Sequence, residues 1–270
     1  MASPLISIEN VTLAYGPQTA RQIILDQTSF RINQGDFVAL VGPSGCGKST
    51  ILKMISGLLK PSAGAVLVKS REIGAVPIRI GMAFQNPTLL PWLSVRDNVM
   101  MPLKIVSPYR EQYRSQRKSS FRARADAMLA QVGLAGQGDK RPWQLSGGML
   151  QRASLCRALI HEPELLMLDE PFGALDQFTR EELWTIMQDL WITRRPTVLL
   201  VTHDLKEAGY LANKIFVMQT KPGRIVQERG VDFPRPRSID TTFSTDFTAL
   251  TYELRAAIVA VRNAEKEPAR

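Results

Sequence analysis

The chain has 270 residues, which is enough for one or two domains with a sizeable hydrophobic core. Its composition, 44% hydrophobic and 22% charged, lies near the globular average and excludes disordered, collagen-like and low-complexity proteins. The net charge of +9 favours nucleic acid or an anionic membrane surface as a partner and does not choose between them.

The sequence shows no sign of export or of a membrane span. Its N-terminal stretch, MASPLISIEN, lacks a basic region ahead of an apolar segment, and no run of about eighteen apolar residues occurs. Two cysteines cannot build a disulfide scaffold, and no Cys/His spacing suggests a metal cage. We therefore expect a protein of a reducing compartment that is neither exported nor membrane-spanning.

Apolar, β-branched runs predict short strands along much of the chain. They lie near residues 5–13, 23–32, 37–41, 65–69, 78–84, 165–168, 197–201 and 214–218. Several, such as 37–41 and 165–168, are continuous rather than alternating, as expected for strands covered by helices on both faces. The sequence therefore predicts an α/β fold with a mainly parallel central sheet. The first two runs alternate and precede any helix, so we expect them in a small antiparallel β subdomain beside that sheet.

Helical periodicity replaces the strand signal between about residues 94 and 161, which predicts an inserted α-helical subdomain. Towards the C-terminus the composition changes to Pro-Arg-Pro-Arg at residues 234–237 and a Ser/Thr-rich stretch, followed by a predicted helix near residues 246–264. We expect one domain over residues 1–230 and a C-terminal tail over residues 231–270 with a linker and one helix.

A glycine-rich loop follows the predicted strand at residues 37–41 and precedes a helical pattern. It matches the sequence G-x-x-x-x-G-K-[ST] of phosphate-binding loops. Its residues are Gly42, Pro43, Ser44, Gly45, Cys46, Gly47, Lys48, Ser49 and Thr50. Glycines let backbone N–H groups turn towards phosphates, and the following helix directs its positive end at them. Lys48 would reach the β- and γ-phosphates, the Ser49 hydroxyl would ligate Mg²⁺, and we interpret Cys46 as a small filler residue.

Two acidic residues follow the buried run at residues 165–168. This is the carboxyl end of a strand, where an α/β sheet presents its ligand crevice. In a nucleotide hydrolase Asp169 would hold Mg²⁺, and Glu170 would polarise the water that attacks the γ-phosphate. On its own an Asp-Glu-Pro sequence can equally end a strand in solvent, but the phosphate loop upstream favours the catalytic interpretation.

A second glycine motif, Leu-Ser-Gly-Gly-Met at residues 145–149, begins a predicted helix. The order of phosphate loop, this signature, the Asp-Glu pair and a histidine after another strand, over residues 5–230, resembles the nucleotide-binding subunit of ATP-binding-cassette (ABC) transporters. The resemblance implies that Ser146, Gly147 and Gly148 close over the γ-phosphate of an ATP held by a second ABC ATPase subunit, in a head-to-tail homo- or heterodimer. Methionine ends the motif where the family most often has glutamine, whose side chain is not a phosphate ligand.

The resemblance also assigns roles to single residues elsewhere in the chain. Tyr15 resembles the aromatic residue that stacks on adenine. Gln85 resembles the glutamine that senses Mg²⁺ and water and links to the membrane partner, and His203 resembles the switch histidine that contacts the γ-phosphate. Asp176 resembles the residue that meets the opposite protomer. We interpret His161 as a surface residue outside this set.

The stretch from Phe84 to Asn98 and the segment from Lys221 to Ile225 resemble the branch of the family that imports nitrate, aliphatic sulfonates, taurine or pyrimidine precursors. That branch uses a separate membrane permease and an external solute-binding protein. The resemblance thus implies an ATPase that uses ATP and Mg²⁺, lies peripherally on the cytoplasmic face of the plasma (inner) membrane and has no nucleic-acid partner. The alternative is a soluble ABC-type ATPase acting on nucleic acid or ribosomes. It would require a coiled-coil insertion or a second cassette, and these 270 residues contain neither.

Basic residues gather between Arg110 and Arg124, where six of them stand against Glu111 alone and give a net charge of +5. A membrane-facing electrostatic patch and a solvated helix face both explain this run, and charge runs most often face water. Trp184 and Trp191 share one side of a predicted helix with apolar residues, so we expect both in the core.

Overall fold

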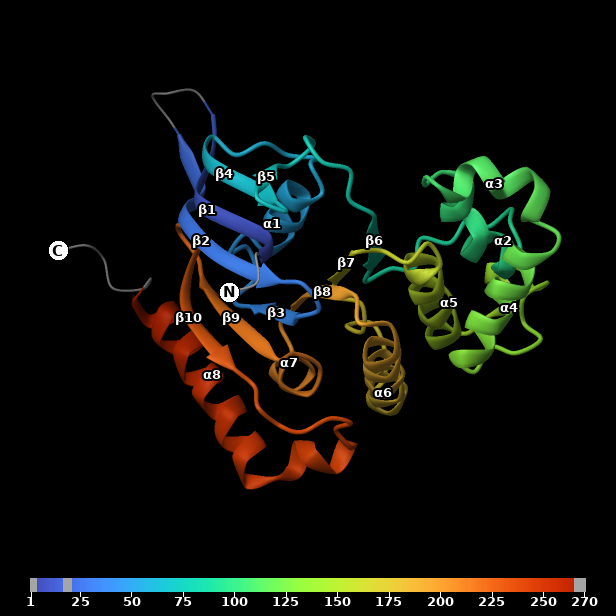
Figure 1. Cartoon of the computed structure of the whole chain (residues 1–270). Helices are drawn as coiled ribbons and strands as arrows, with labels where there is room; N and C mark the ends of the chain where they lie inside the picture. Colours follow the sequence, from blue (N-terminus) through green and yellow to red (C-terminus); the bar gives the residue numbers. More distant parts are fainter. Residues whose placement is uncertain (1–3, 17–20, 265–270) are drawn as a thin grey trace. The chain divides into compact units, whose positions relative to one another are not determined.

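The two ends of the chain fold together, and its middle forms a unit of its own (Figure 1). The computed structural model describes residues 4–16 and 21–264. The first unit comprises residues 1–78 and 188–270, and the second comprises residues 79–187. Among the described residues, no helix is both long enough and apolar enough to cross a bilayer.

An antiparallel sheet in the first unit has the strand order β2-β1-β4-β5. Its strands are β1 (Pro4–Tyr15), β2 (Gln22–Asn33), β4 (Ala63–Val68) and β5 (Arg71–Glu72). Ile6 of β1 lies opposite Ile32 of β2 and Val68 of β4, and all three side chains are buried. Because side chains alternate along a strand, one face of this sheet contributes to the core. The predicted antiparallel β subdomain is confirmed, although the sequence does not predict the two-residue strand β5.

A mainly parallel arrangement in the first unit has the strand order β10-β9-β3-β8. Its strands are β3 (Phe37–Val41), β8 (Thr197–Thr202), β9 (Lys214–Gln219) and β10 (Arg224–Gly230). Strand β3 is parallel to β8 and β9, whereas β10 pairs with β9 in the antiparallel sense. Every side chain of β3 and β8 is buried, which explains their continuous apolar runs. The sequence does not predict β10, because it is a charged edge strand with no buried side chain.

Helices of the first unit pack on these strands. They are α1 (Lys48–Ile55), α7 (Leu205–Leu211), α8 (Thr245–Ala264) and the 3-10 helix η4 (Ile239–Phe243). Helix α8 runs beside β9 and α7 and buries Phe247, Leu250 and Leu254 on one face, which is the spacing of an amphipathic helix (Figure 1). The helix predicted near residues 246–264 is thus confirmed.

Arg237 ties the segment between β10 and α8 to the first unit. This residue is only 3% exposed, and its guanidinium donates hydrogen bonds to the carbonyls of Gly209, Tyr210 and Ala212 at 2.7–2.9 Å and of Val231 and Phe233 at 3.2 Å. Burial lowers the pKa of Arg237 to about 10, so the group stays charged at neutral pH. The Pro-Arg-Pro-Arg composition predicts a linker here. In the structure the last of its arginines is a core residue, because five carbonyls replace the water that a cation requires.

The second unit combines a pair of parallel strands with a group of helices. The strands β6 (Ile80–Phe84) and β7 (Leu165–Asp169) pair in register from their first residues to their last. The helices are α2 (Val95–Met100), η2 (Met101–Lys104), α3 (Tyr109–Gln116), α4 (Ser120–Gln131), η3 (Pro142–Gln144), α5 (Gly147–Leu159) and α6 (Gln177–Arg194), which continues into the first unit. Residues 94–161 contain helices and no strand, as the sequence predicts. Trp184 and Trp191 on α6 are buried, also as predicted.

The interpretation of His161 as a surface residue is wrong, because its side chain is 3% exposed. It follows α5 and lies against β6, where its Nε2 is 3.1 Å from the carbonyl oxygen of Ile80. Its Nδ1 is buried and has no hydrogen-bond partner within residues 4–16 and 21–264. Burial lowers the pKa of His161, and the positive charges of Arg79 and Arg124 lower it further, so the neutral ring is the stable form.

A buried neutral histidine makes the stability of the protein sensitive to acid. Below a pH of about 6.5 the unfolded chain takes up a proton on His161 that the folded chain does not bind, so we expect the free energy of unfolding to fall from pH 7 to pH 5. In His161→Gln, whose amide can still donate to Ile80, the fall should be shallower in urea titrations at each pH. Equal slopes in His161→Gln and wild type would contradict the assignment.

Candidate functional site

The glycine-rich loop connects β3 to α1 and depends on glycine at residue 47. Gly47 has a φ of 99°, and a Cβ atom there would lie 2.6 Å from Cδ2 of Leu25. Gly45 also has a left-handed φ, of 81°. These angles are strained for other residues, and they let the loop turn sharply between strand and helix. Ser44, Gly45 and Ser49 are exposed, so the loop is open to a ligand.

Lys48 lies inside this loop with its charge buried. The residue is 7% exposed, and its Nζ donates to the carbonyls of Gly42 at 2.8 Å and Pro43 at 2.9 Å. Among the described residues no carboxylate pairs with it. Because buried charges in proteins are normally paired, this ammonium fits an anionic ligand such as a phosphate. Burial raises the pKa of the neighbouring Cys46 thiol, although Lys48 lies 3.7 Å from its Sγ, which agrees with the interpretation of Cys46 as an unreactive filler.

The pairing of β3 with β8 in the first unit places His203 close to the glycine-rich loop. Val41 pairs with Thr202, so the carboxyl ends of β3 and β8 are adjacent, and the loop follows one end while His203 follows the other. His203 is exposed. Tyr15 lies at the end of β1 and is 51% exposed, so its ring is accessible for stacking. The roles of both residues stay predictions.

The second unit brings together Gln85, Asp169 and Glu170. Phe84 pairs with Asp169, so Gln85 directly follows the end of β6 next to the end of β7. A Cβ atom on Gly173 would lie 3.4 Å from Nε2 of Gln85 and 3.6 Å from the carbonyl oxygen of Glu170, so the Gln85 amide and the Glu170 backbone both lie close to Gly173. Glu170 follows the last residue of β7 with a left-handed φ of 48°, which ends the extended run of the strand.

Oxygen donors suited to Mg²⁺ occur in both units. Asp169 is half-buried at the end of β7, and Ser49 is exposed in the first turn of α1. Carboxylates and hydroxyls are the hard ligands that Mg²⁺ prefers, and this ion commonly binds through one or two protein groups together with substrate phosphates. Each unit therefore contains an oxygen donor of the kind that the predicted ion prefers.

The signature motif forms the N-terminus of α5. The Ser146 Oγ caps the helix by accepting a hydrogen bond from the amide of Met149, and Gly147 is the first helical residue. Ser146 and Gly147 are exposed, whereas a Cβ atom on Gly148 would lie 2.6 Å from Cγ2 of Thr179. Gly148 is therefore required for packing against α6, and the exposed helix N-terminus offers a second anion-binding end.

Asp176 has a structural role that the sequence does not predict. Its Oδ1 accepts a hydrogen bond from the amide of Thr179 at 3.1 Å, so it caps the N-terminus of α6. This backbone amide lowers the pKa of Asp176, which keeps the carboxylate charged. Its contact with an opposite protomer stays a prediction.

Sequence reasoning also misses Gln151. This residue is 2% exposed on α5, and its Nε2 donates to the carbonyl of Phe84 at 3.0 Å, immediately before Gln85. It thus joins the signature helix to the end of β6 inside the second unit. An amide at a helix position that points into an apolar core is the signal that would have identified it.

Known proteins match this chain over most of its length. The family described as ABC transporter matches residues 25–173. An aliphatic sulfonates import ATP-binding protein of Bacillus licheniformis is 40% identical over 86% of this chain and 87% of its own length. A bicarbonate transport ATP-binding protein of Synechococcus elongatus is 40% identical over 87% and 82%, and a taurine import ATP-binding protein of Mesorhizobium japonicum is 41% identical over 86% of both.

Among solved structures, a dimeric ATP-binding cassette in a post-hydrolysis state with ADP and Pi is similar to this chain. The TM-score is 0.71 at 30% identity, and the match covers 85% of this chain and 100% of that one. The α/β fold class and the order of motifs agree with these matches. The chain therefore belongs to the ABC transporter family and is an ATPase of that family.

Proposed function

We propose that this chain is the ATP-hydrolysing subunit of an importer for a small oxyanion such as a sulfonate, taurine, bicarbonate or nitrate, with a pyrimidine precursor as a further candidate. The observation that carries the proposal is the similarity to sulfonate, bicarbonate and taurine import ATP-binding proteins, at about 40% identity across at least 86% of the chain. The buried, carboxylate-free ammonium of Lys48 in the phosphate loop supports ATP as its substrate.

The residues of the two units divide the work of hydrolysis. Lys48 and the loop amides hold the phosphates of ATP, and Tyr15 stacks on the adenine. Ser49 and Asp169 would hold Mg²⁺ and Gln85 would sense it, and a bound ion would supply neutralisation of phosphate charge. Glu170 orients and polarises the attacking water, and His203 contacts the γ-phosphate.

A second ATPase subunit completes each nucleotide site. The exposed N-terminus of α5, with Ser146 and Gly147, is an anion-binding end that a phosphate bound to another subunit can fill. In a head-to-tail homo- or heterodimer Asp176, at the start of α6, faces that subunit. The dimeric state of the similar solved structure supports this arrangement.

A separate permease carries the solute and docks on the second unit. An apolar groove of about 520 Å³ lies between β6, η2 and α5, and Phe84 and Ile105 on it are 37% and 58% exposed. Phe84 in its lining directly precedes Gln85, the residue assigned to sense Mg²⁺ and water and to link to the membrane partner. A segment of the permease in this groove would place the chain on the cytoplasmic face of the membrane, where an external solute-binding protein delivers solute to the other side.

Copurification tests the proposal. A tagged chain is extracted from membranes, and the proteins that accompany it are identified by mass spectrometry. A multi-span permease is the expected companion, and Ile105→Glu should lose it. Ile23→Glu is the matched control, since Ile23 is 46% exposed on β2 outside the groove, and it should keep the permease. If ribosomes or DNA copurify with the chain and no membrane protein does, the importer function is wrong and the chain is a soluble ABC-type ATPase.

A further inference from the structure

A basic hollow of about 230 Å³ lies in the second unit between α2, the end of α3 and the start of α4. Its lining includes four basic and two acidic side chains, and with Asp126, which pairs with Arg96 from outside the lining, positive charge is in excess by one. Arg117, Lys118 and Arg122 lie on one side of it, and all three are exposed. The importer function does not account for this charge.

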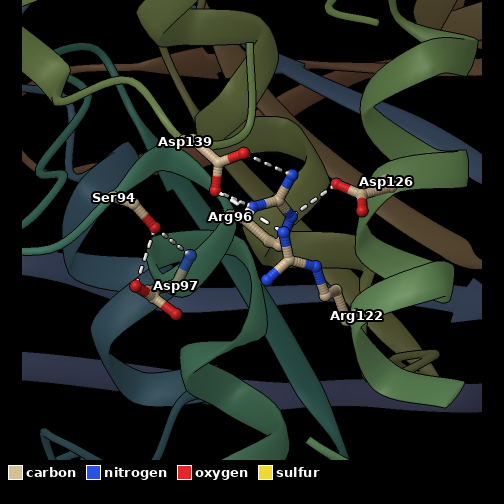
Figure 2. Close-up of polar contacts among 6 residues, drawn as sticks. All are labelled: Ser94, Arg96, Asp97, Arg122, Asp126 and Asp139. Atoms are coloured by element: carbon tan, nitrogen blue, oxygen red, sulfur yellow. Dashed lines mark hydrogen bonds and ion pairs between the residues drawn. The ribbon is translucent and has the colours of Figure 1, made fainter. Parts of the chain in front are cut away.

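Arg96 forms part of the wall of the hollow, and its positive charge is balanced by carboxylates that hold it in place. Figure 2 shows the Arg96 guanidinium between two carboxylates. Its Nε donates to Asp126 at 2.6 Å, and its Nη1 and Nη2 both donate to Asp139. These hydrogen bonds raise the pKa of Arg96 and lower that of Asp139, so both stay charged. Arg96 is therefore a fixed part of the wall and is not available to a ligand.

The acidic groups of the hollow are engaged by other partners, and Arg117 and Lys118 are the cations left for an anion. Asp97 is occupied by the Ser94 hydroxyl, which donates to it at 2.7 Å (Figure 2). Arg122 lies 3.7 Å from Asp139, whose carboxylate Arg96 already occupies. No carboxylate among the described residues pairs with Arg117 or Lys118.

The donors around the hollow match a phosphate group. Two guanidinium groups, of Arg117 and Arg122, and the Lys118 ammonium offer N–H donors from adjacent helix ends, and charge-assisted hydrogen bonds of this kind are the strong ones. The half-buried Tyr113 adds a phenol from the same side. Burial and the charge of Asp97 raise the pKa of Tyr113, so its hydroxyl keeps the proton that it would donate.

The hollow lies next to the groove assigned to the permease. Met100, at the end of α2, lines the hollow, and the following residues Met101 and Ile105 line the groove. A permease segment in the groove therefore brings the hollow close to the membrane surface. We propose that the basic hollow binds the phosphate headgroup of an anionic phospholipid. The membrane orientation in this argument rests on the proposed importer function.

Vesicle cosedimentation of the purified full chain tests the proposal. We expect binding to phosphatidylcholine vesicles that contain about a third phosphatidylglycerol and no binding to pure phosphatidylcholine. The double variant Arg117→Gln/Lys118→Gln should weaken binding by about ten- to thirty-fold. Each basic residue near an anionic surface typically strengthens binding by about five-fold, and this variant removes two. Its rate of ATP hydrolysis should not change.

The matched control is Lys60→Gln/Arg71→Gln, which removes the same charges from exposed positions of the first unit. Its vesicle binding should change less than about twofold, and an equal loss in both double variants would show unspecific attraction and overturn the site. Inorganic phosphate alone forms the second arm. If calorimetry detects phosphate in the hollow while vesicles do not bind, the lipid proposal is wrong. The vesicle assay needs no permease, so failure there with successful permease copurification would refute the lipid site and leave the importer function intact.

Discussion

Glu170→Gln is expected to lower ATP turnover by about two to four orders of magnitude while ATP still binds. Glutamine keeps the size of the side chain and the backbone at φ 48°, but it cannot accept a proton from the attacking water. The bound nucleotide should then persist, and the dimer should stay closed around it. Single-turnover hydrolysis and nucleotide binding, measured on the same preparation, separate the chemical step from affinity.

Glu162→Gln is the matched control for this variant. Glu162 belongs to the same unit and has a similar left-handed φ of 49°, but it pairs with Arg124 and lies outside the candidate site. Its turnover should stay near that of the wild type. Near-normal turnover in Glu170→Gln would remove Glu170 from the mechanism.

Lys48→Ala is expected to weaken ATP binding by about 10- to 100-fold. A hydrogen bond to a charged group contributes about 1.5–3 kcal/mol, and each 1.4 kcal/mol corresponds to a tenfold change in affinity. In this structure the Lys48 ammonium donates to the carbonyls of Gly42 and Pro43. When ATP is bound, we expect it to donate to the phosphates, and alanine has no such group. Fluorescence titration with a nucleotide analogue measures the affinity.

Lys53→Ala provides the comparison, because Lys53 is an exposed lysine on the same helix, α1. It should bind ATP as the wild type does. A melting temperature for Lys48→Ala checks that the loop and its helix remain folded. Unchanged ATP binding in a folded Lys48→Ala protein would contradict the phosphate contact.

The sequence predicts a strand reliably where all of its side chains are buried, because the strand is then a continuous apolar run. Strands β3 and β8 are buried on every side chain, so their apolar runs are unmistakable. Strand β10 is not predicted from the sequence. It is an edge strand in which polar residues are mixed with apolar ones, and none of its seven residues is buried. The error at His161 has a different origin. Its burial depends on β6, a strand some eighty residues earlier, and no local pattern contains that contact.

The candidate site divides in the same way. The phosphate loop and the signature are contiguous motifs whose spacing carries their chemistry, so the sequence predicts their residues. The supporting contacts come from distant segments. The Leu25 side chain occupies the space that a side chain at residue 47 would need, and the Gln151 amide donates to the carbonyl of Phe84. In both contacts the two residues are far apart in the sequence. Such contacts require tertiary structure.

The division of the chain sets an order of events during its synthesis. The second unit, residues 79–187, is continuous and leaves the ribosome as one piece, so it can fold before translation ends. Strand β3 must wait, because its partners β8 and β9 begin at residues 197 and 214. The five carbonyls that accept hydrogen bonds from Arg237 lack that donor until still later. The phosphate loop, which hangs from β3, is thus among the first segments translated and among the last to gain a finished scaffold.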